Sequence, residues 1–416
     1  APADEMFAPF AHPIVWLMAG AAVIGAAVER TRLDRKIAAA CLPRRPQSLW
    51  LTLGRVAGIT CLLSGVRPGA STAAMMVPVA REATGPLGRR SEATGLLAVG
   101  AMASVGGLLT PIGAPSNLIA IAAIAQYGTT DLPFLHWCLM ALPVVALLWL
   151  ASLLWLRLRL GADAGRRVHG DLKLPGNAVL PTTAALHLAD TRPFAWGMDR
   201  GQAAALFVAI AAMLLWLAPG VLATQVPAGV VALLGAAMLF VLPAAPRRAG
   251  GVALRRSVLS WPEAAQIDWG EILLLGGGLA LGHQMVATGL SHWLGDLTVR
   301  ALSVNGVWGL TWLVTALALA ITQVARNTVT AAVLCPLAVV AAQQIGVSAV
   351  APCVATAMAT SLAFCMPLSS DANAVVFAAG SIEAREMARS GLAGMVFGFL
   401  VVPPLAIAMG SLLALV

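Results

Sequence analysis

Long apolar runs recur along the chain, and short segments rich in arginine separate them. Runs of this length predict helices that cross or deeply enter a hydrocarbon layer about 30 Å thick. The pattern therefore predicts an all-α integral membrane protein with several spans. The expected apolar helices cover residues 13–28, 49–66, 93–108, 137–156, 202–217, 227–242, 271–286, 307–322 and 391–416.

Residues 67–126 recur in a related form as residues 325–384. The offset stays within 256–258 residues when Thr72 is matched with Thr330, Pro78 with Pro336, Pro111 with Pro367 and Asn117 with Asn373. A register held over this length indicates an internal duplication. Each copy predicts a hairpin with a polar tip, followed by a helix broken just before the shared asparagine.

The duplication also predicts how the chain is organised. In each copy we expect a span, a second span, a re-entrant hairpin, the broken helix and a final span. Two copies separated by an intervening pair of spans suggest inverted topology, with a substrate site at the repeat interface near the membrane midplane. The expected units are a first repeat at 1–160, a polar connector at 161–201, scaffold helices with a basic loop at 202–265, and a second repeat at 266–416.

Composition supports the membrane interpretation and narrows the function. Hydrophobic residues make up 59% of the chain and charged residues 11%, against about 25% charged residues in soluble domains. The net charge of +8 comes from arginine clusters between the apolar runs, which is the loop bias of membrane proteins rather than a sign of nucleic-acid binding. The six cysteines lack CxxC spacing, so we expect neither a disulfide framework nor a metal site. Catalytic sets such as HExxH or a P-loop are also lacking in the sequence, and we do not expect an enzyme.

The hairpin tips and helix breaks are the candidate chemistry. Backbone NH and CO groups freed at such places are tolerated within a membrane only when they are buried or line a wet cavity. Helix N-termini at a break favour anions, and free carbonyls suit a cation such as Na⁺. In the second copy the tip is Arg326-Asn327-Thr328 and the break runs from Ser369 to Asn373; in the first copy the tip is Pro68-Gly69-Ala70 and the break runs from Gly113 to Asn117.

At these residues the chain resembles the divalent anion:sodium symporter (DASS) family, which includes the sodium/dicarboxylate and sodium/sulfate cotransporters. The segments LSWPEAAQIDWGEILLLGGGLAL, TQVARNTVTAAVLCPLA and SLAFCMPLSSDANAVVFAAG carry it most specifically. The resemblance implies a homodimeric, multi-pass carrier of the bacterial inner membrane. It also implies a scaffold and a transport domain that moves like an elevator, with Na⁺ as coupling ion and no other cofactor.

The family's Ser-Asn-Thr tips and Thr-Pro-Pro-Asn-like breaks imply roles for matching residues. Substrate contacts fall on Asn327, Thr328, Ser370, Asn117 and Asn373, and ion contacts on Gly113, Ser116, Asn117, Thr322, Asn327 and Asn373. The family also has earlier scaffold helices than this sequence shows, so those helices are either absent or missing from a truncated record.

Several residues depart from the family pattern. Arg326 replaces the tip serine, Asp371 replaces a proline of the break, and Gln323 replaces a glutamate before the tip. The first tip has lost all three polar residues and follows Arg67. Because a buried guanidinium repels a neighbouring cation, we hypothesise that Arg326 stands in for the second Na⁺ and Arg67 for the first. Asp371 would then pair with Arg326 or carry a proton; alternatively, both arginines point to water at a cavity rim.

The sequence thus predicts a secondary active transporter of a small divalent anion, a C4-dicarboxylate first and sulfate second. A Na⁺-independent exchanger, a proton-coupled carrier and a non-transporting degenerate paralogue remain as alternatives. Outside the site, His283 is expected to be a packed, hydrogen-bonded histidine, with a proton relay as the alternative. Glu29 and Glu271 are expected to be interfacial.

Overall fold

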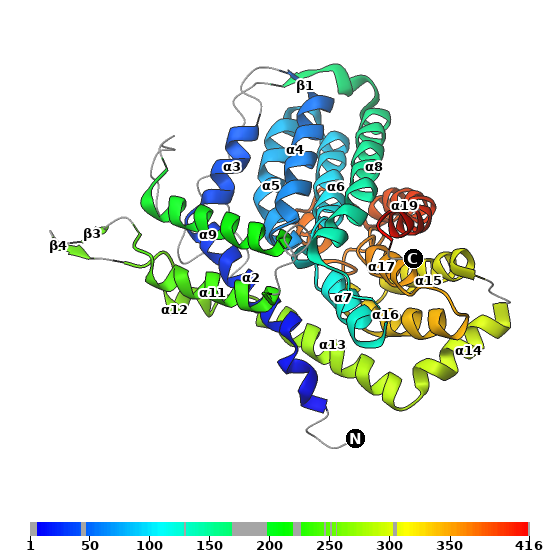
Figure 1. The fold of residues 1–416 in the computed structure, drawn as a ribbon. Coiled ribbons are helices and arrows are strands. Elements are labelled where there is room, and N and C mark those ends of the chain that lie inside the picture. Colours follow the sequence, from blue (N-terminus) through cyan, green and yellow to red (C-terminus); the bar gives the residue numbers. More distant parts are fainter. Residues whose placement is uncertain are drawn as a thin grey trace.

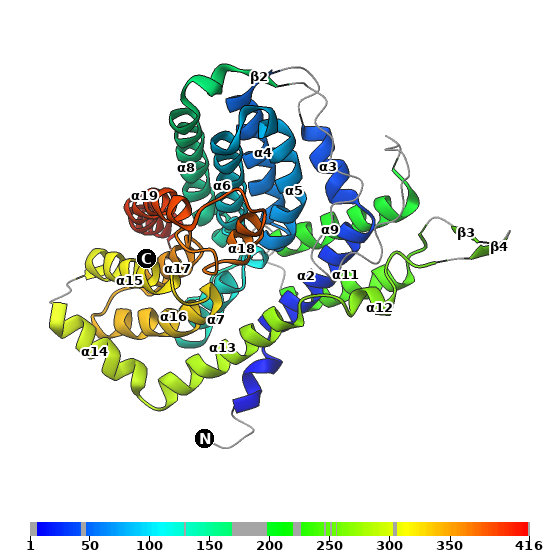
Figure 2. The same ribbon diagram turned by 180° about the vertical axis from the view of Figure 1, so that it is seen from behind.

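Figures 1 and 2 show a protein built almost entirely of helices in the parts of the chain that the structure describes. The structure is a computed structural model, and it describes residues 6–42, 47–128, 130–168, 198–218, 226–244, 247–249, 252–254, 256–302 and 306–414. The expected polar connector at 161–201 falls largely on residues 169–197, which lie outside the described residues. Its described ends are a short 3-10 helix with strand β2, and the start of helix α9.

The first half of the chain contains helices η1 (Ala8–Ala11), α2 (Pro13–Arg30), α3 (Leu33–Cys41), α4 (Leu49–Ser64), α5 (Gly69–Thr84), η2 (Gly85–Leu87), α6 (Arg89–Gly106), η3 (Pro111–Gly113), α7 (Pro115–Tyr127), α8 (Phe134–Leu160) and η4 (Gly161–Gly165). Two short strands, β1 (Gln47–Ser48) and β2 (Arg167–Val168), pair antiparallel and join the start of α4 to the segment after α8.

The second half contains helices α9 (Arg200–Leu217), α11 (Ala228–Val241), α12 (Trp261–Ala264), α13 (Trp269–Ala287), α14 (Leu290–Leu302), α15 (Gly306–Thr322), α16 (Asn327–Gln344), α17 (Val350–Thr360), α18 (Asp371–Ala378) and α19 (Ala384–Leu412). Strands β3 (Arg247–Ala249) and β4 (Val252–Leu254) form an antiparallel hairpin within the expected basic loop.

Each hairpin is made of two consecutive helices joined by a four-residue loop, and the last residue of this loop is the first residue of the tip. Helices α4 and α5 form the first and α15 and α16 the second, and the two arms of each pack together. The expected order of two spans and then a hairpin was therefore wrong. The apolar runs at 49–66 and 307–322 are the first arms of the hairpins, because the polar tip follows directly at the end of each run.

The broken helices interleave the two copies. Helix α6 is the first half of the first broken helix and packs on α4 and α5. Helix α7 is its second half and packs on α16 and α17 of the other copy. Helix α17 packs on α15 and α16 of its own copy, and α18 packs on α5 and α6 of the first. Each hairpin thus contacts one half of its own broken helix and one half of the other, and Figure 2 shows α18 lying beside α5 and α6.

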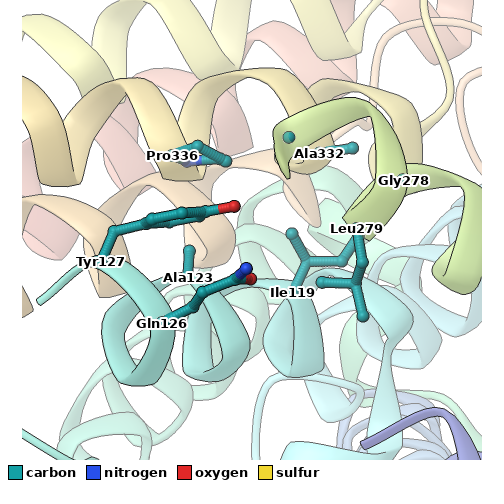
Figure 3. A pocket seen from close by; sticks show the side chains of 9 residues that line it. Ile119, Ala123, Gln126, Tyr127, Gly278, Leu279, Ala332 and Pro336 are labelled. Carbon is teal, nitrogen blue, oxygen red and sulfur yellow. The ribbon is translucent and has the colours of Figure 1, made fainter. Parts of the chain in front are cut away.

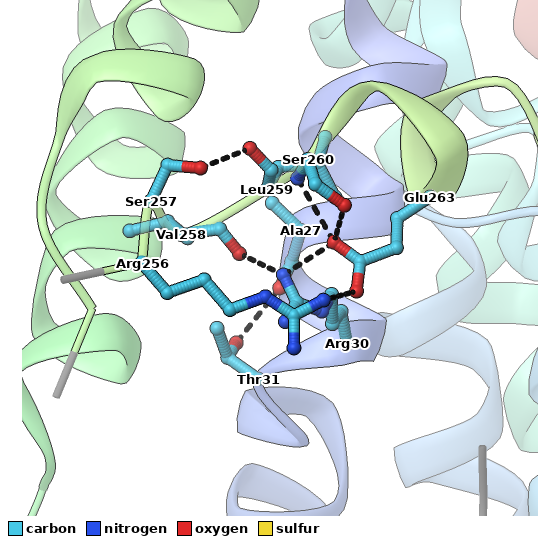
Figure 4. Close-up of polar contacts among 9 residues, drawn as sticks. All are labelled: Ala27, Arg30, Thr31, Arg256, Ser257, Val258, Leu259, Ser260 and Glu263. Atoms are coloured by element: carbon cyan, nitrogen blue, oxygen red, sulfur yellow. Dashed lines mark hydrogen bonds and ion pairs between the residues drawn. The ribbon is translucent and has the colours of Figure 1, made fainter. Parts of the chain in front are cut away.

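Helices α2, α9 and α11 pack together beside this core (Figure 1). Helix α2 packs closely along α11, where a Cβ atom added to Gly20 would lie 2.5 Å from the backbone carbon of Ala232. Figure 4 shows how α12 is fastened to the end of α2: the Glu263 carboxylate bonds Arg30 at 2.6 Å and Arg256 at 2.6 Å. The segment just before the second repeat is thereby tied to the first repeat outside the hairpin core.

The apolar helices are long enough for a membrane protein. Within the described residues, five helices are long and apolar enough to cross a bilayer, and a sixth is counted if α13 and α14, which bend by 74° at their junction, are taken as one span. This confirms the predicted all-α membrane protein.

Candidate functional site

The site is built around two matched asparagines. Asn117 Nδ2 donates to the carbonyl oxygens of Gly107 and Thr110, both at 2.8 Å. Asn373 Nδ2 donates to the carbonyl oxygens of Ala363 and Met366 at 2.7 and 3.1 Å. In both copies the acceptors lie ten and seven residues before the asparagine. The amide NH₂ groups therefore hold the break loops in shape by satisfying buried carbonyls.

The oxygen atom of the Asn117 amide group, unlike its NH₂ group, is not satisfied by the loop. Asn117 is fully buried, and within the described residues its Oδ1 atom has no hydrogen-bond partner. A buried acceptor without a donor is costly, so a cation or a proton donor at this place would stabilise it. Asn117 is thus a candidate ligand in the first break.

Close backbone approach shapes the first break. A Cβ atom added to Gly113 would lie 2.5 Å from the carbonyl oxygen of Gly107. Any side chain at this position would force the loop apart. Gly113 therefore keeps the break compact.

Serine pairs join the breaks of the two copies. Ser116 Oγ lies 3.3 Å from Ser361 Oγ, where α7 begins next to the end of α17. Ser104 Oγ lies 3.5 Å from Ser370 Oγ, where α6 ends next to the start of α18. The structure thus brings Ser116, Ser370 and both asparagines to one region. Sequence reasoning missed Ser104 and Ser361, because a contact between copies leaves no local pattern.

The end of the first arm of each hairpin is hydrogen-bonded to the first half of the broken helix of its own copy. Ser64 donates to the carbonyl oxygen of Ala103 in the first copy. In the second copy, the hydroxyl group of Thr322 lies 2.7 Å from the carbonyl oxygen of Thr360 and 2.9 Å from Asn327 Oδ1. Gln323 adds a further link, because its Oε1 accepts from the backbone NH of Cys365 at 3.1 Å. Thr322 and Gln323 therefore position the tip.

The second tip carries an ion pair. Arg326 Nη2 lies 3.1 Å from both carboxylate oxygens of Asp371, and the two side chains are 55% and 53% exposed. The expected Arg326–Asp371 pairing is therefore present. Arg326 precedes the first residue of α16 and Asp371 is the first residue of α18, so two helix N-termini meet at the pair.

Other charged and polar residues surround this pair. Asn327 and Thr328, the first two residues of α16, are half-buried beside it. The Glu271 carboxylate at the start of α13 interacts electrostatically with Asp371, Arg326 and Asp268. Sequence reasoning treated Glu271 as a residue at a span end and did not predict that it faces the second tip.

Arg67 does not lie where we expected. Its guanidinium is 3% exposed and forms ion pairs with Asp34, which is equally buried, and with Glu29 at 3.3 Å. These carboxylates belong to α3 and α2 and already compensate the charge. Neither expectation for Arg67 fits this position: it is not a free positive charge at the first tip, and it does not point to water.

The described cavities lie apart from the ion pair. Figure 3 shows one of about 10 Å³ between α7, α13 and α16, lined by apolar groups with Gln126 and Tyr127, which is space for about one water molecule. A larger one of about 210 Å³ is lined by apolar residues including Pro111, Leu118 and Trp216. Near the smaller one, His283 Nδ1 lies 3.1 Å from Gln126 Nε2 and 3.4 Å from the Tyr127 hydroxyl, as expected for a packed, hydrogen-bonded histidine.

The chain is similar to known carriers along most of its length. It is 26% identical to the sodium-dependent dicarboxylate transporter SdcS of Staphylococcus saprophyticus over 408 residues, which covers 93% of this chain and 75% of that protein. SdcS of Staphylococcus aureus is 26% identical over 409 residues, covering 93% of this chain and 74% of that protein.

Two solved structures share the fold. The YdaH transporter of Alcanivorax borkumensis aligns with a TM-score of 0.55 and 17% identity over 98% of this chain and 86% of its own. MtrF of Neisseria gonorrhoeae, described with a class of antimetabolite efflux pumps, aligns with a TM-score of 0.58 and 12% identity over 97% of this chain and 82% of its own.

The sequence model of the citrate transporter family (CitMHS) matches residues 1–363. These similarities confirm the resemblance to divalent-anion carriers and the expectation of a transporter rather than an enzyme. The chain is a multi-pass membrane protein that belongs to the citrate transporter family.

Proposed function

We propose that this protein is a secondary active transporter of a C4-dicarboxylate, with sulfate as the second candidate, that works across the bacterial inner membrane by an elevator motion. The observation that carries the substrate class is the meeting of two helix N-termini at Arg326, with Asn327 and Thr328 beside it. Helix N-termini and a guanidinium both favour carboxylates. The sodium-dependent dicarboxylate transporters to which the chain is similar support the same class.

Substrate contacts are assigned to the second tip and the adjoining break. Arg326 and Thr328 bind one carboxylate, Asn327 and Ser370 add polar contacts, and Asn117 and Asn373 hold the two breaks that frame the site. The serine pairs between the breaks support a common site, because they fasten the ends of α6 and α17 to the starts of α18 and α7.

Sodium fits the first break better than the second. The buried Asn117 Oδ1 has no donor among the described residues, and Gly113 and Ser116 adjoin it in the chain. At the second tip, the Arg326 guanidinium disfavours a neighbouring cation. We therefore assign one Na⁺ to the first break and give Arg326 the place of the second. Arg67, neutralised by Asp34 and Glu29, takes no part in this assignment.

Uptake into proteoliposomes tests the function. Radiolabelled succinate and sulfate are supplied to the purified protein under separately imposed Na⁺, proton and counter-anion gradients. We expect succinate uptake that depends on Na⁺ and is abolished in Asn327→Ala. Uptake driven only by counter-anion would identify an exchanger, and uptake unaffected by Asn327→Ala would refute the assigned site.

Binding of succinate distinguishes a working carrier from a degenerate, non-transporting protein. Succinate raises the thermal stability of a protein that binds it in the folded state. Stabilisation by succinate that disappears in Asn327→Ala supports a working site at the second tip. If neither succinate nor sulfate stabilises the wild type and neither is taken up, the proposal fails.

A further inference from the structure

The Arg326–Asp371 ion pair belongs to the second copy alone. At the duplication offset, Arg326 corresponds to Pro68 and Asp371 to Pro115, so two prolines of the first copy are replaced by two opposite charges. Proline is an ordinary choice just before or at the first residue of a helix. A helix start therefore needs neither charge, and the two occur together at one contact.

The carboxylate of Asp371 occupies the position that a substrate carboxylate would take. It begins α18, where the positive end of the helix favours an anion, and both its oxygens lie 3.1 Å from Arg326 Nη2. Within the described part of the chain, Nη2 is the guanidinium nitrogen through which Arg326 bonds Asp371, so the pair engages one edge of the guanidinium. An incoming carboxylate competes with Asp371 for the same charge.

The pair is suited to exchange of partners. Both side chains are more than half exposed, and ion pairs in such surroundings are weak because water screens them. A dianion in solution can therefore reach Arg326 and displace Asp371. The short Asp371 side chain then turns to water without leaving a buried charge.

We propose that Asp371 acts as an internal substitute for the substrate anion, neutralising Arg326 in the anion-free carrier so that the carrier can return across the membrane without cargo. This inference rests on the proposed function. A carrier that has a fixed positive charge in its site must either pair that charge with an anion or move the unpaired charge through the low-dielectric barrier. With Asp371 present, the charge of Arg326 is balanced in the anion-free site, and net transport is possible. Without Asp371, the carrier can move readily only when an anion is bound.

Comparison of two flux modes tests the inference. Proteoliposomes with equal Na⁺ on both sides are loaded with radiolabelled succinate, and efflux is measured into buffer with and without unlabelled succinate. The wild type should release label in both buffers. In Asp371→Asn, efflux into succinate-free buffer should fall at least about tenfold relative to exchange, because an uncompensated charge must cross the barrier.

Two further variants separate charge balance from damage. Arg326→Gln with Asp371→Asn removes both charges of the pair and leaves no unbalanced guanidinium, so its ratio of net efflux to exchange should return toward the wild-type ratio even if affinity falls. Glu383→Gln removes a carboxylate from the exposed Arg89–Glu383 pair outside the site and should leave the ratio unchanged.

The results of this test distinguish a failure of the inference from a failure of the proposed function. Equal net efflux in wild type and Asp371→Asn, with exchange intact, contradicts the inference while leaving dicarboxylate transport standing. A wild type that exchanges but shows no net efflux also contradicts it. No flux of either kind in the wild type contradicts the proposed function and this inference together. If Asp371→Asn does not fold, Asp371→Glu, which keeps the charge, must retain net efflux, and its loss would equally overturn the inference.

Discussion

Asp34 and Arg67 show most clearly where single residues could not be interpreted from sequence. The second tip was predictable, because Arg326 and Asp371 both fall on matched positions of the duplication and carry opposite charges. Arg67 was not, because its partner Asp34 lies on another helix, 33 residues earlier, and no motif links them. The orientation of Asn117 was also beyond reach: sequence identifies the amide at the break but not which of its atoms the loop already uses.

Loss of Asp34 should destabilise the protein strongly. Asp34→Ala leaves the buried Arg67 guanidinium with Glu29 alone, and removal of one partner of a buried ion pair costs about 3 kcal/mol in the free energy of unfolding. Unfolding in detergent measures the change. Asp34→Ala combined with Arg67→Met should recover a large part of the loss, and Glu383→Gln, in the exposed pair, should have a much smaller effect. If Asp34→Ala alone were as stable as the wild type, the Asp34–Arg67 pair would not contribute to the free energy of unfolding.

At the scale of elements, the duplication predicted the hairpins and the breaks but not their arrangement. Repeated residues such as Pro111 and Pro367 marked where each helix is interrupted. The sequence could not show that α7 leaves its own hairpin for the other copy's, because that choice depends on contacts between residues far apart in the chain. The same limit explains why the first arms of the hairpins were taken for separate spans.

The compact first break should not tolerate a side chain at Gly113. In Gly113→Ala the new Cβ atom would meet the carbonyl oxygen of Gly107 at 2.5 Å, and overpacking of this kind costs about 1–3 kcal/mol. We expect a lower melting temperature and impaired Na⁺-dependent uptake. Gly277→Ala is the matched control, since a Cβ atom there meets nothing within 4 Å. Equal behaviour of the two variants would contradict the role given to Gly113.

The interleaved breaks should move as one body if the carrier works as an elevator. Ser116 Oγ and Ser361 Oγ are 3.3 Å apart, close enough for a disulfide between cysteines at these positions to be tried. In a background without the six native cysteines, oxidation of Ser116→Cys/Ser361→Cys should leave succinate uptake at the level that the same variant shows when reduced. Loss of uptake on oxidation, restored by reduction, would show that the breaks separate during transport.

At the scale of the whole molecule, the two copies have one architecture and unequal chemistry. The first break offers a buried amide oxygen at Asn117 that has no partner among the described residues, whereas the second tip presents the Arg326–Asp371 pair. The fold class was predictable from the apolar runs and the long duplication, and the family from the motif segments that resemble the DASS family. The asymmetry that we propose for ion coupling followed only when the partners of Arg67 and Arg326 were known.

The dependence of succinate uptake on Na⁺ concentration tests the central claim most directly. Initial rates in proteoliposomes are measured for the wild type and for Arg326→Ser/Asp371→Pro, which restores the tip and break residues of the DASS pattern. If Arg326 takes the place of the second Na⁺, the wild-type rate should rise hyperbolically, with one Na⁺ per cycle, and the double variant should require a further Na⁺ and respond sigmoidally. A sigmoidal wild-type response, or uptake that is independent of Na⁺, would contradict the claim that one Na⁺ binds and Arg326 takes the place of the second.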